Sequence, residues 1–301
     1  MPTKTVQSAF GKVARISYVI PDAAPFVASL WGAFAEGRRQ ADLEAPGTSK
    51  QSLPIRRFAQ AATWCCTMLT EALELRDFGA DALRRYMANN RERLRSPTLP
   101  TISFDASPWG GGGVLWQDGK PTAYTHFAWN DHSLQTLNAS RGDCRGQTAF
   151  EFATLFIVAE TFSTVLAETG AMIRGDNLGA LSVALKLTST TAAMNTIARE
   201  LAWRRIVRRW QYLLKHLPAE QNDEADALSR LVAKPRRSMP KLGNAKFVAP
   251  PKQDDRLWRA RLDFTSAISR SQKKKIKLRW NKNHRSEKSH SVKESEIEWP
   301  L

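Results

Sequence analysis

Four carboxylates stand where the surrounding pattern predicts the end of a strand or one face of a helix: Asp105, Glu151, Asp176 and Asp226. Clustered carboxylate oxygens suit Mg²⁺ or Mn²⁺, whereas zinc favours nitrogen and sulfur ligands. Two such cations, about 3.5 to 4 Å apart, can hydrolyse a phosphodiester. If folding gathers these acids, the chemistry predicted for the chain is metal-dependent cleavage of a nucleic acid.

Glu151 is the acid whose position the helical pattern supports independently. Leu155, Val158 and Phe162 fall within about 40° of it at helical spacing, so it should face the core. Glu160 lies on the opposite side of the same helix and is predicted to face solvent. A carboxylate aimed inward is costly unless a cation or donors compensate. The alternative is a glutamate at a helix start, stabilised by the helix dipole.

The other three acids have ordinary alternatives. Asp105 ends an apolar run, and the four glycines that follow Trp109 could approach a ligand closely, but an Asp can also simply close a turn. Asp176 follows a predicted strand and could bind a ligand there, unless it or Asn177 caps the next helix. Asp226 could be a surface residue of a short polar helix.

The elements that would position these acids change character along the chain. Helical patterns over the first 50 residues, over 55–78 and over 81–95 precede a Pro-bearing break at 96–100. Beyond it, alternation and turn residues predict three antiparallel strands, followed by alternating helices and strands. The predicted strands are 101–106, 111–116, 122–129, 171–175 and 211–217, and the predicted helices are 147–168, 177–187, 194–210 and 223–231.

Four motifs carry a resemblance to a known family: Ile102 to Gly110, Gln147 to Glu151, Arg174 to Leu181, and His216 to Leu231. Together they resemble the ribonuclease H domain of retrotransposon reverse transcriptases over about residues 100–232. The run Asn-x-x-Ala-Asp-Ala-Leu-Ser-Arg, which contains Asp226, is the most specific. Residues 10–26 are more loosely similar to the segment after the polymerase palm. The sequence has no Tyr/Phe-x-Asp-Asp motif, so no polymerase activity is expected.

The resemblance implies a fold, a reaction and a set of ligands. The fold would be α/β, with a mixed five-stranded sheet flanked by helices. The four acids would hold two Mg²⁺ ions, or Mn²⁺, with Asp105 shared, and would cleave the RNA strand of an RNA/DNA hybrid. Repulsion among the acids should make at least one of them bind a proton more readily when no metal is present. Asn177, Gln147 and Asn222 carry amide side chains near the acids that could contact the substrate's 2′-hydroxyls; the alternative is that they are ordinary surface polar residues. Many relatives carry a histidine before the last helix, but His216 lies earlier here and is assigned no catalytic role.

The basic composition of the chain indicates a polyanionic partner. The chain of 301 residues has a net charge of +16, and residues 232–301 hold 19 Lys and Arg against 7 Asp and Glu, which is +12 of the total. This segment is predicted to be a mostly disordered basic tail. Cys65, Cys66 and Cys144 match neither a disulfide framework nor a zinc site. With no membrane segment recognised, the protein is expected to be intracellular, cytoplasmic or nuclear. The oligomeric state is not predicted.

Four regions and three hypotheses follow from these patterns. The regions are a helical segment at 1–50, a helical connection at 51–99, the ribonuclease H-like domain at 100–232 and the tail at 233–301. The first hypothesis is an active hybrid-specific ribonuclease belonging to a retroelement reverse transcriptase. The second is a catalytically weak or inactive nucleic-acid-binding remnant of a retrotransposon polyprotein. The third makes the basic tail the main functional part.

Overall fold

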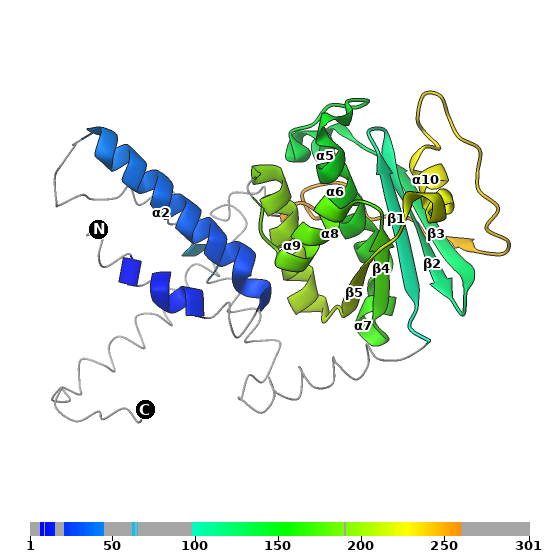
Figure 1. Ribbon diagram of the computed structural model, residues 1–301, viewed down its shortest axis with the longest axis horizontal. Coiled ribbons are helices and arrows are strands. Elements are labelled where there is room, and N and C mark those ends of the chain that lie inside the picture. Colours follow the sequence, from blue (N-terminus) through cyan, green and yellow to red (C-terminus); the bar gives the residue numbers. More distant parts are fainter. Residues whose placement is uncertain are drawn as a thin grey trace, which may run out of the picture. The chain divides into compact units, whose positions relative to one another are not determined.

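The computed structural model describes residues 7–8, 10–15, 21–44, 62–63, 65, 98–189 and 191–259 (Figure 1). The helices predicted over 55–78 and 81–95, and the tail beyond residue 259, lie almost entirely outside these residues. In the N-terminal region, the helical prediction agrees with η1 (Pro21–Ala23) and α2 (Ala24–Glu44). No helix among the described residues is long and apolar enough to cross a membrane.

A six-stranded mixed sheet forms the centre of the domain, with strand order β5-β4-β1-β2-β3-β6. Neighbouring strands β1, β2 and β3 pair antiparallel, whereas β4 runs parallel to β1 and β5 parallel to β4. The prediction of an α/β fold with a mixed sheet flanked by helices is confirmed, with one strand more than expected. The strands are β1 (Thr101–Ser107), β2 (Gly110–Gln117), β3 (Lys120–Ala128), β4 (Ala171–Gly175), β5 (Tyr212–His216) and β6 (Lys246–Phe247).

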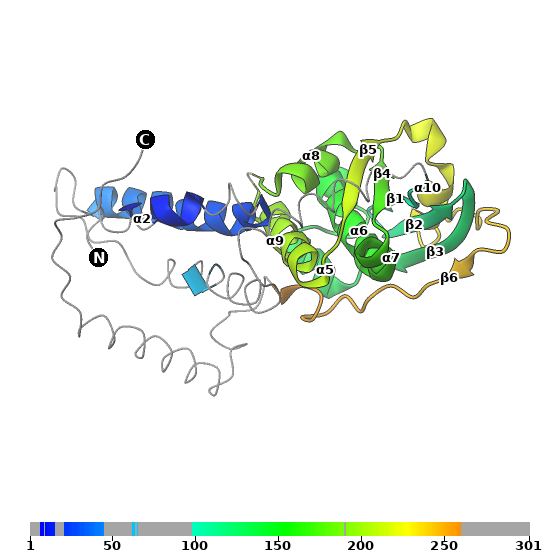
Figure 2. The ribbon, with the colours of Figure 1, turned by 90° about the horizontal axis from the view of Figure 1, so that it is seen from below.

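The glycines of β2 let helices approach both faces of the sheet. A Cβ added to Gly111 or Gly113 would meet Thr154 or Val158, both of α6 (Gln147–Thr161). A Cβ added to Gly112 would meet Leu228 at 2.4 Å, in α10 (Asp223–Ser229). Since alternate residues of a strand face opposite sides, α6 and α10 cover opposite faces (Figure 2). Within the described residues, the close approach that Gly111, Gly112 and Gly113 permit is used for helix packing.

The long helix predicted over 147–168 is divided in two. The first part is α6, and α7 (Ser163–Glu168) follows after a break at Phe162, whose backbone leaves the helical region. Every residue from Phe150 to Ala159 is buried, so α6 forms the centre of the core against β1 and β2. The remaining helices of the domain are α5 (Asp131–Leu137), α8 (Leu178–Lys186) and α9 (Ala192–Arg208), with the 3-10 turns η2 (Cys144–Gly146) and η3 (Ala219–Gln221).

The chain after α10 packs against the domain up to about residue 259, within the segment predicted to be a tail. Strand β6 pairs with β3, and Trp258 is fully buried against Phe156. The Trp258 indole donates a hydrogen bond to Ser133 Oγ in α5 at 2.9 Å. Burial of a tryptophan is strongly stabilising, so this part of the basic segment belongs to the fold. It also covers α5, which lies in the stretch 129–145 for which the sequence predicted no element.

Candidate metal centre

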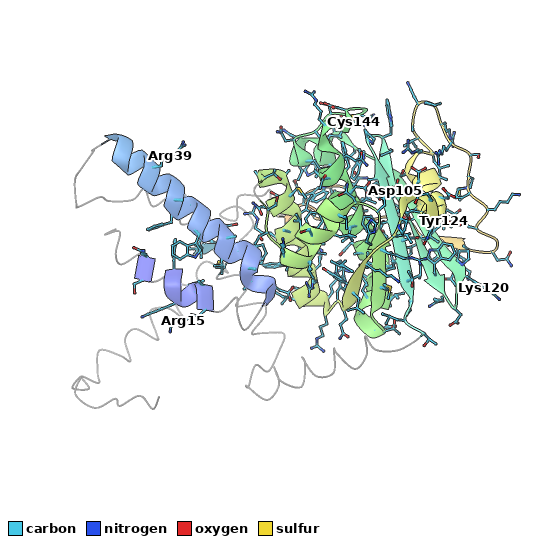
Figure 3. The ribbon with its side chains drawn as sticks, in the orientation of Figure 1. Arg15, Arg39, Asp105, Lys120, Tyr124 and Cys144 are labelled. Atoms are coloured by element: carbon cyan, nitrogen blue, oxygen red, sulfur yellow. The ribbon has the colours of Figure 1, made fainter. Side chains whose placement is uncertain are left out.

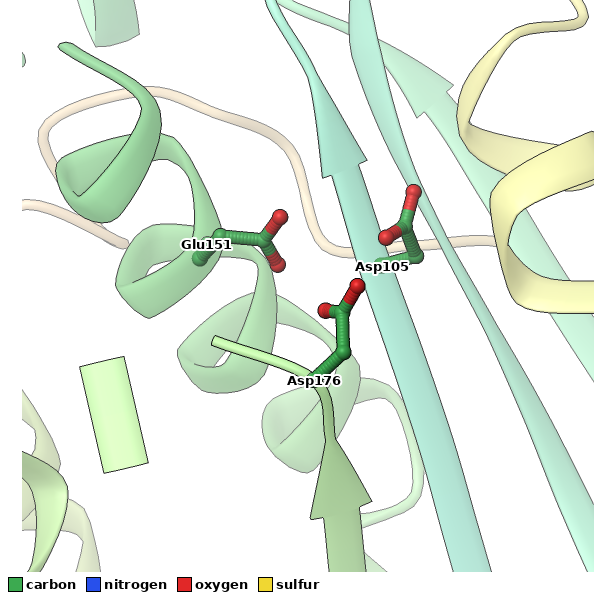
Figure 4. A group of neighbouring side chains, drawn as sticks. All are labelled: Asp105, Glu151 and Asp176. Atoms are coloured by element: carbon green, nitrogen blue, oxygen red, sulfur yellow. The ribbon is translucent and has the colours of Figure 1, made fainter. Parts of the chain in front are cut away.

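Three of the four predicted acids converge at one end of the sheet. Asp105 lies in β1, Glu151 in the first turns of α6, and Asp176 directly after β4. Each offers one carboxylate oxygen within 4.8 Å of the others'. Figure 4 shows the three carboxylates directed toward a common space between the helix and the two strands. Because β1 and β4 are parallel neighbours, their carboxyl ends meet at this edge.

Asp105 is buried, at 5% exposure, and its side chain is held from the α10 side of the sheet. Its Oδ2 accepts a hydrogen bond of 2.7 Å from the Ser229 hydroxyl. Burial, followed by the negative charges of Asp226 and Asp176, raises the pKa of Asp105 to about 7, against the lowering effect of the Ser229 hydrogen bond. The predicted readiness of one acid to bind a proton is therefore present at Asp105.

Glu151 is 3% exposed and points inward, as the helical pattern predicted. Its Oε1 accepts a hydrogen bond of 2.8 Å from the Gln147 amide, which also donates to the Ala106 carbonyl at 2.7 Å. Burial and then the charge of Asp105 raise the pKa of Glu151 well above its ordinary value. Oε2 is buried and has no hydrogen-bond partner among the residues that the structure describes.

Asp176 contributes a second unpartnered oxygen. Its Oδ1 is buried and, within the described part of the chain, accepts no hydrogen bond. The neighbouring Asn177 caps α8, because its Oδ1 accepts from the Ala180 amide at 3.0 Å. The two roles considered for this turn therefore belong to different residues. Asn177 caps the helix, and Asp176 faces the other acids.

The arrangement fits a divalent cation. A buried carboxylate oxygen without a donor is costly, and here two such oxygens belong to one group of three acids. A cation bound among them would satisfy both oxygens. It would also offset the burial and the mutual repulsion that raise the pKa values of Asp105 and Glu151. Oxygen-only ligands suit hard cations such as Mg²⁺, Mn²⁺ or Ca²⁺.

Asp226 lies outside this group of three. It is close enough for its charge to raise the pKa of Asp105, but its own carboxylate is paired with two arginines. Arg230 Nε is 2.6 Å from its Oδ1, and Arg237 Nη1 donates to its Oδ2. Of the four predicted acids, three thus form a cluster. Asp226 lies beside it and is paired with the guanidinium groups of two arginines.

All three predicted substrate contacts make hydrogen bonds within the protein. The Asn222 amide donates to the Phe104 carbonyl at 2.9 Å and ties the start of α10 to β1. Asn222 is only 2% exposed, which argues against direct contact with a substrate. Gln147 orients Glu151, as described above, and Asn177 caps a helix. A substrate contact by Gln147 or Asn177 stays a prediction.

The prediction of a solvent-facing Glu160 is wrong. Its side chain is 8% exposed and forms ion pairs with Arg204 at 3.2 Å and Arg208 at 2.5 Å. Helix α9 packs against α6 on that side, so its arginines cover the face that the isolated helix would expose. Two arginines of the basic run 203–210 thus pair with an acid of the core.

Two neighbours of the acids were not predicted. Ser229 was part of the motif around Asp226 but was assigned no role, although its position three residues later on one helix face was available as a signal. His216, at the end of β5, has Nε2 3.2 Å from the Asp176 backbone oxygen. Its pairing with Gly175 across parallel strands places it beside the cluster. That pairing has no signature in the local sequence.

Comparison with known proteins adds distant structural neighbours. No protein-family model matches the sequence, and no curated protein matches it. Ribonuclease H1 of the halophilic archaeon Halobacterium salinarum NRC-1 is 19% identical, with 45% of this chain and 98% of that one covered and a TM-score of 0.35. The compost-derived LC11 ribonuclease H1 is 14% identical, covering 46% and 97%, with a TM-score of 0.37. A prototype foamy virus protease–reverse transcriptase is 11% identical, covering 82% and 26%, with a TM-score of 0.29.

Proposed function

We propose that this protein is a divalent-metal-dependent endonuclease that hydrolyses the RNA strand of RNA/DNA hybrids. The observation that carries the proposal is the pair of buried, unpartnered oxygens on Glu151 and Asp176, within a group whose ligand atoms lie within 4.8 Å of one another. Within the described residues, neither oxygen accepts a hydrogen bond of ordinary geometry. The Ala106 backbone amide lowers the pKa of Glu151 only as the last of its causes, so a cation is the simplest partner for the two oxygens.

The ligands proposed are Asp105, Glu151 and Asp176, with Asp226 joining them, and the ions are two Mg²⁺ or Mn²⁺. When bound, such ions activate water and stabilise the leaving oxygen of a phosphodiester. The chain's own residues hold these acids in place. Gln147 orients Glu151, Ser229 donates to Asp105, and Asn222 ties α10 to the strand that carries Asp105.

The wider context follows from the sequence resemblance. We propose that the domain is part of a retroelement reverse transcriptase, with the helical regions at 1–50 and 51–99 preceding the nuclease at 100–232. The packing of residues 233–259 on the sheet extends that domain. The basic remainder up to residue 301 would attract nucleic acid without sequence preference.

The alternative is a binding remnant with little or no turnover. The pairing of Asp226 with two arginines favours this alternative, because an acid engaged in this way is less available to a cation. If the protein is an active nuclease, the pairing of Asp226 with the arginines has to open when substrate binds.

A cleavage assay distinguishes the two. Purified protein is incubated with end-labelled RNA/DNA hybrid, single-stranded RNA and duplex DNA, each with Mg²⁺ or with EDTA. We expect Mg²⁺-dependent cleavage of the hybrid's RNA strand and its loss in Asp176→Asn, while the exposed control Asp223→Asn keeps it. Hybrid binding without any Mg²⁺-dependent product supports the remnant, and cleavage unchanged in Asp176→Asn refutes the proposed site.

A further inference from the structure

The two arginines that hold Asp226 remain open to solvent. The side chains of Arg230 and Arg237 are 47% and 52% exposed, whereas that of Asp226 is 20% exposed. A backbone hydrogen bond of 3.2 Å from Arg237 to the Arg230 carbonyl fixes the returning chain beside α10. Each carboxylate oxygen of Asp226 thus has a guanidinium partner, and each partner can be reached from outside.

Arg237 also lines a cavity whose wall is largely apolar but includes residues with hydrogen-bond donors. The cavity is open, has a volume of about 480 Å³, and is lined by His126, Leu231, Arg236, Arg237, Ser238 and Met239. Burial and then the charge of Arg236 lower the pKa of His126. Arg236 and Arg237 are the two permanently charged residues that line this cavity. Guanidinium and hydroxyl groups around an open cavity are a donor set for an oxyanion, and guanidinium geometry matches phosphate especially well.

We propose that Arg237, with Arg236 beside it, binds a backbone phosphate of the nucleic acid, and that this contact draws Arg237 away from Asp226. Asp226 then has a free oxygen for a divalent cation. This inference rests on the proposed function, because it takes nucleic acid to bind at the cluster of acids. Cation binding and nucleic-acid binding then reinforce each other, because both require the ion pair between Arg237 and Asp226 to open.

Phosphate is favoured over a protein carboxylate because three arginines lie within eight residues of one another in the chain, at the end of α10 and just after it. Arg230, Arg236 and Arg237 lie along one returning segment, and a nucleic-acid backbone presents successive charges that such a segment can follow. Each phosphate neutralised by an arginine releases counterions. Removing one such arginine should therefore change the slope of log affinity against log salt by about one.

The first test is hybrid binding in EDTA, where no cleavage occurs. We expect Arg237→Gln and Arg236→Gln each to reduce the salt slope for an RNA/DNA hybrid by about one. Lys120→Gln removes the same charge from the β2–β3 hairpin, at the end of the sheet away from Asp105 (Figure 3), and should leave the slope unchanged. Slopes of the arginine variants equal to that of Lys120→Gln overturn the proposal.

The second test is Mn²⁺ binding without nucleic acid, followed by calorimetry or electron paramagnetic resonance. Arg237→Gln should bind Mn²⁺ about fivefold more tightly than wild type, because one guanidinium no longer competes for Asp226. Arg236→Gln should bind Mn²⁺ as wild type does. Mn²⁺ affinity in Arg237→Gln no higher than in wild type refutes the exchange. If that variant does not fold, the salt slope of Arg236→Gln still decides whether phosphate binds here.

These results separate the inference from the proposed function. If the protein cleaves no substrate but Arg237→Gln changes both the salt slope and the Mn²⁺ affinity, the coupling is supported and the nuclease proposal is refuted. If the protein cleaves the hybrid but Arg237→Gln changes neither the salt slope nor the Mn²⁺ affinity, the nuclease proposal is supported and the coupling is refuted.

Discussion

The Ser229 hydroxyl donates a 2.7 Å hydrogen bond to Asp105 Oδ2, while the Ser229 carbonyl accepts one of 2.8 Å from Ser107. One residue of α10 is thereby joined to two residues of β1. Ser229 is fully buried, so this connection is protected from water. It lowers the pKa of a carboxyl group that burial otherwise raises. Ser229 is therefore a positioning residue for the proposed metal centre.

Replacing this serine should shift metal binding to higher pH. Ser229→Ala removes the donor, so the pKa of Asp105 rises further and the pH of half-maximal Mg²⁺ binding moves upward by about one unit. Stability should fall by about 1 kcal/mol. Ser133→Ala is the matched control, because it loses the buried hydrogen bond that the Trp258 indole donates to Ser133 in α5, a helix that carries none of the acids. An equal pH shift in both variants would contradict this role.

Asp105 should make the metal-free protein less stable as the pH rises. Its pKa is about 7 in the folded state and near 3.8 when unfolded, so the folded state binds the extra proton between these values. Stability is consequently lost as the pH rises from about 4 to about 7. Asp105→Asn should stabilise the protein in EDTA by roughly 1–4 kcal/mol at pH 8 and much less near pH 4.

Urea unfolding at several pH values measures this difference. Glu220→Gln changes an exposed acid and serves as the control, with little effect expected at any pH. A stabilisation by Asp105→Asn that is the same at pH 5 and pH 8 would show that the proton on Asp105 is not involved.

Divalent cations should stabilise the protein more at high pH than at low pH. The ligands must lose their protons before they bind a cation, and the pKa values of both Asp105 and Glu151 are raised. The increase in Tm on adding Mg²⁺ should be larger at pH 8 than at pH 6. Glu151→Gln should largely remove the increase. A shift of equal size at both pH values would mean that Mg²⁺ binds elsewhere.

The distance between α10 and the sheet should depend on Gly112. A methyl group there would lie 2.4 Å from Leu228 Cβ and 2.8 Å from the Ser229 nitrogen. Gly112→Ala should cost about 2–3 kcal/mol and weaken metal binding, because the helix must move away from Asp105. Gly146→Ala is the control, since its nearest contact would be an ordinary 3.5 Å. Unchanged unfolding and metal affinity in Gly112→Ala would contradict this packing.

The segment after α10 should contribute to stability through Trp258. Trp258→Ala should destabilise the protein by about 3–5 kcal/mol, because it removes a fully buried ring. Trp258→Phe should cost less, since it keeps most of the packing and loses the hydrogen bond to Ser133. Urea unfolding measures both variants. Two variants as stable as wild type would mean that this segment is dispensable for the fold.

Much of the fold follows from patterns that are local in the sequence. Alternation and turn residues predicted β1 to β3 within a few residues, and β4 is bounded as expected at 171–175. The inward direction of Glu151 came from helical spacing alone. Glu160 was misplaced by the same reasoning, because a single helix does not reveal that α9 brings arginines to its other side.

The surroundings of the acids depend on contacts between distant parts of the chain. Local motifs and spacing pointed to Asp105, Glu151 and Asp176, which the structure brings together, since strand and helix periodicity act over a few residues. They could not reveal that Ser229 reaches Asp105 across 124 positions, or that Arg237 returns to Asp226. Nor could they place Trp258 in the core, because its partners Ser133 and Phe156 lie more than 100 positions earlier. Such pairings arise when helices and returning segments pack on the sheet, and short stretches of sequence carry no record of them.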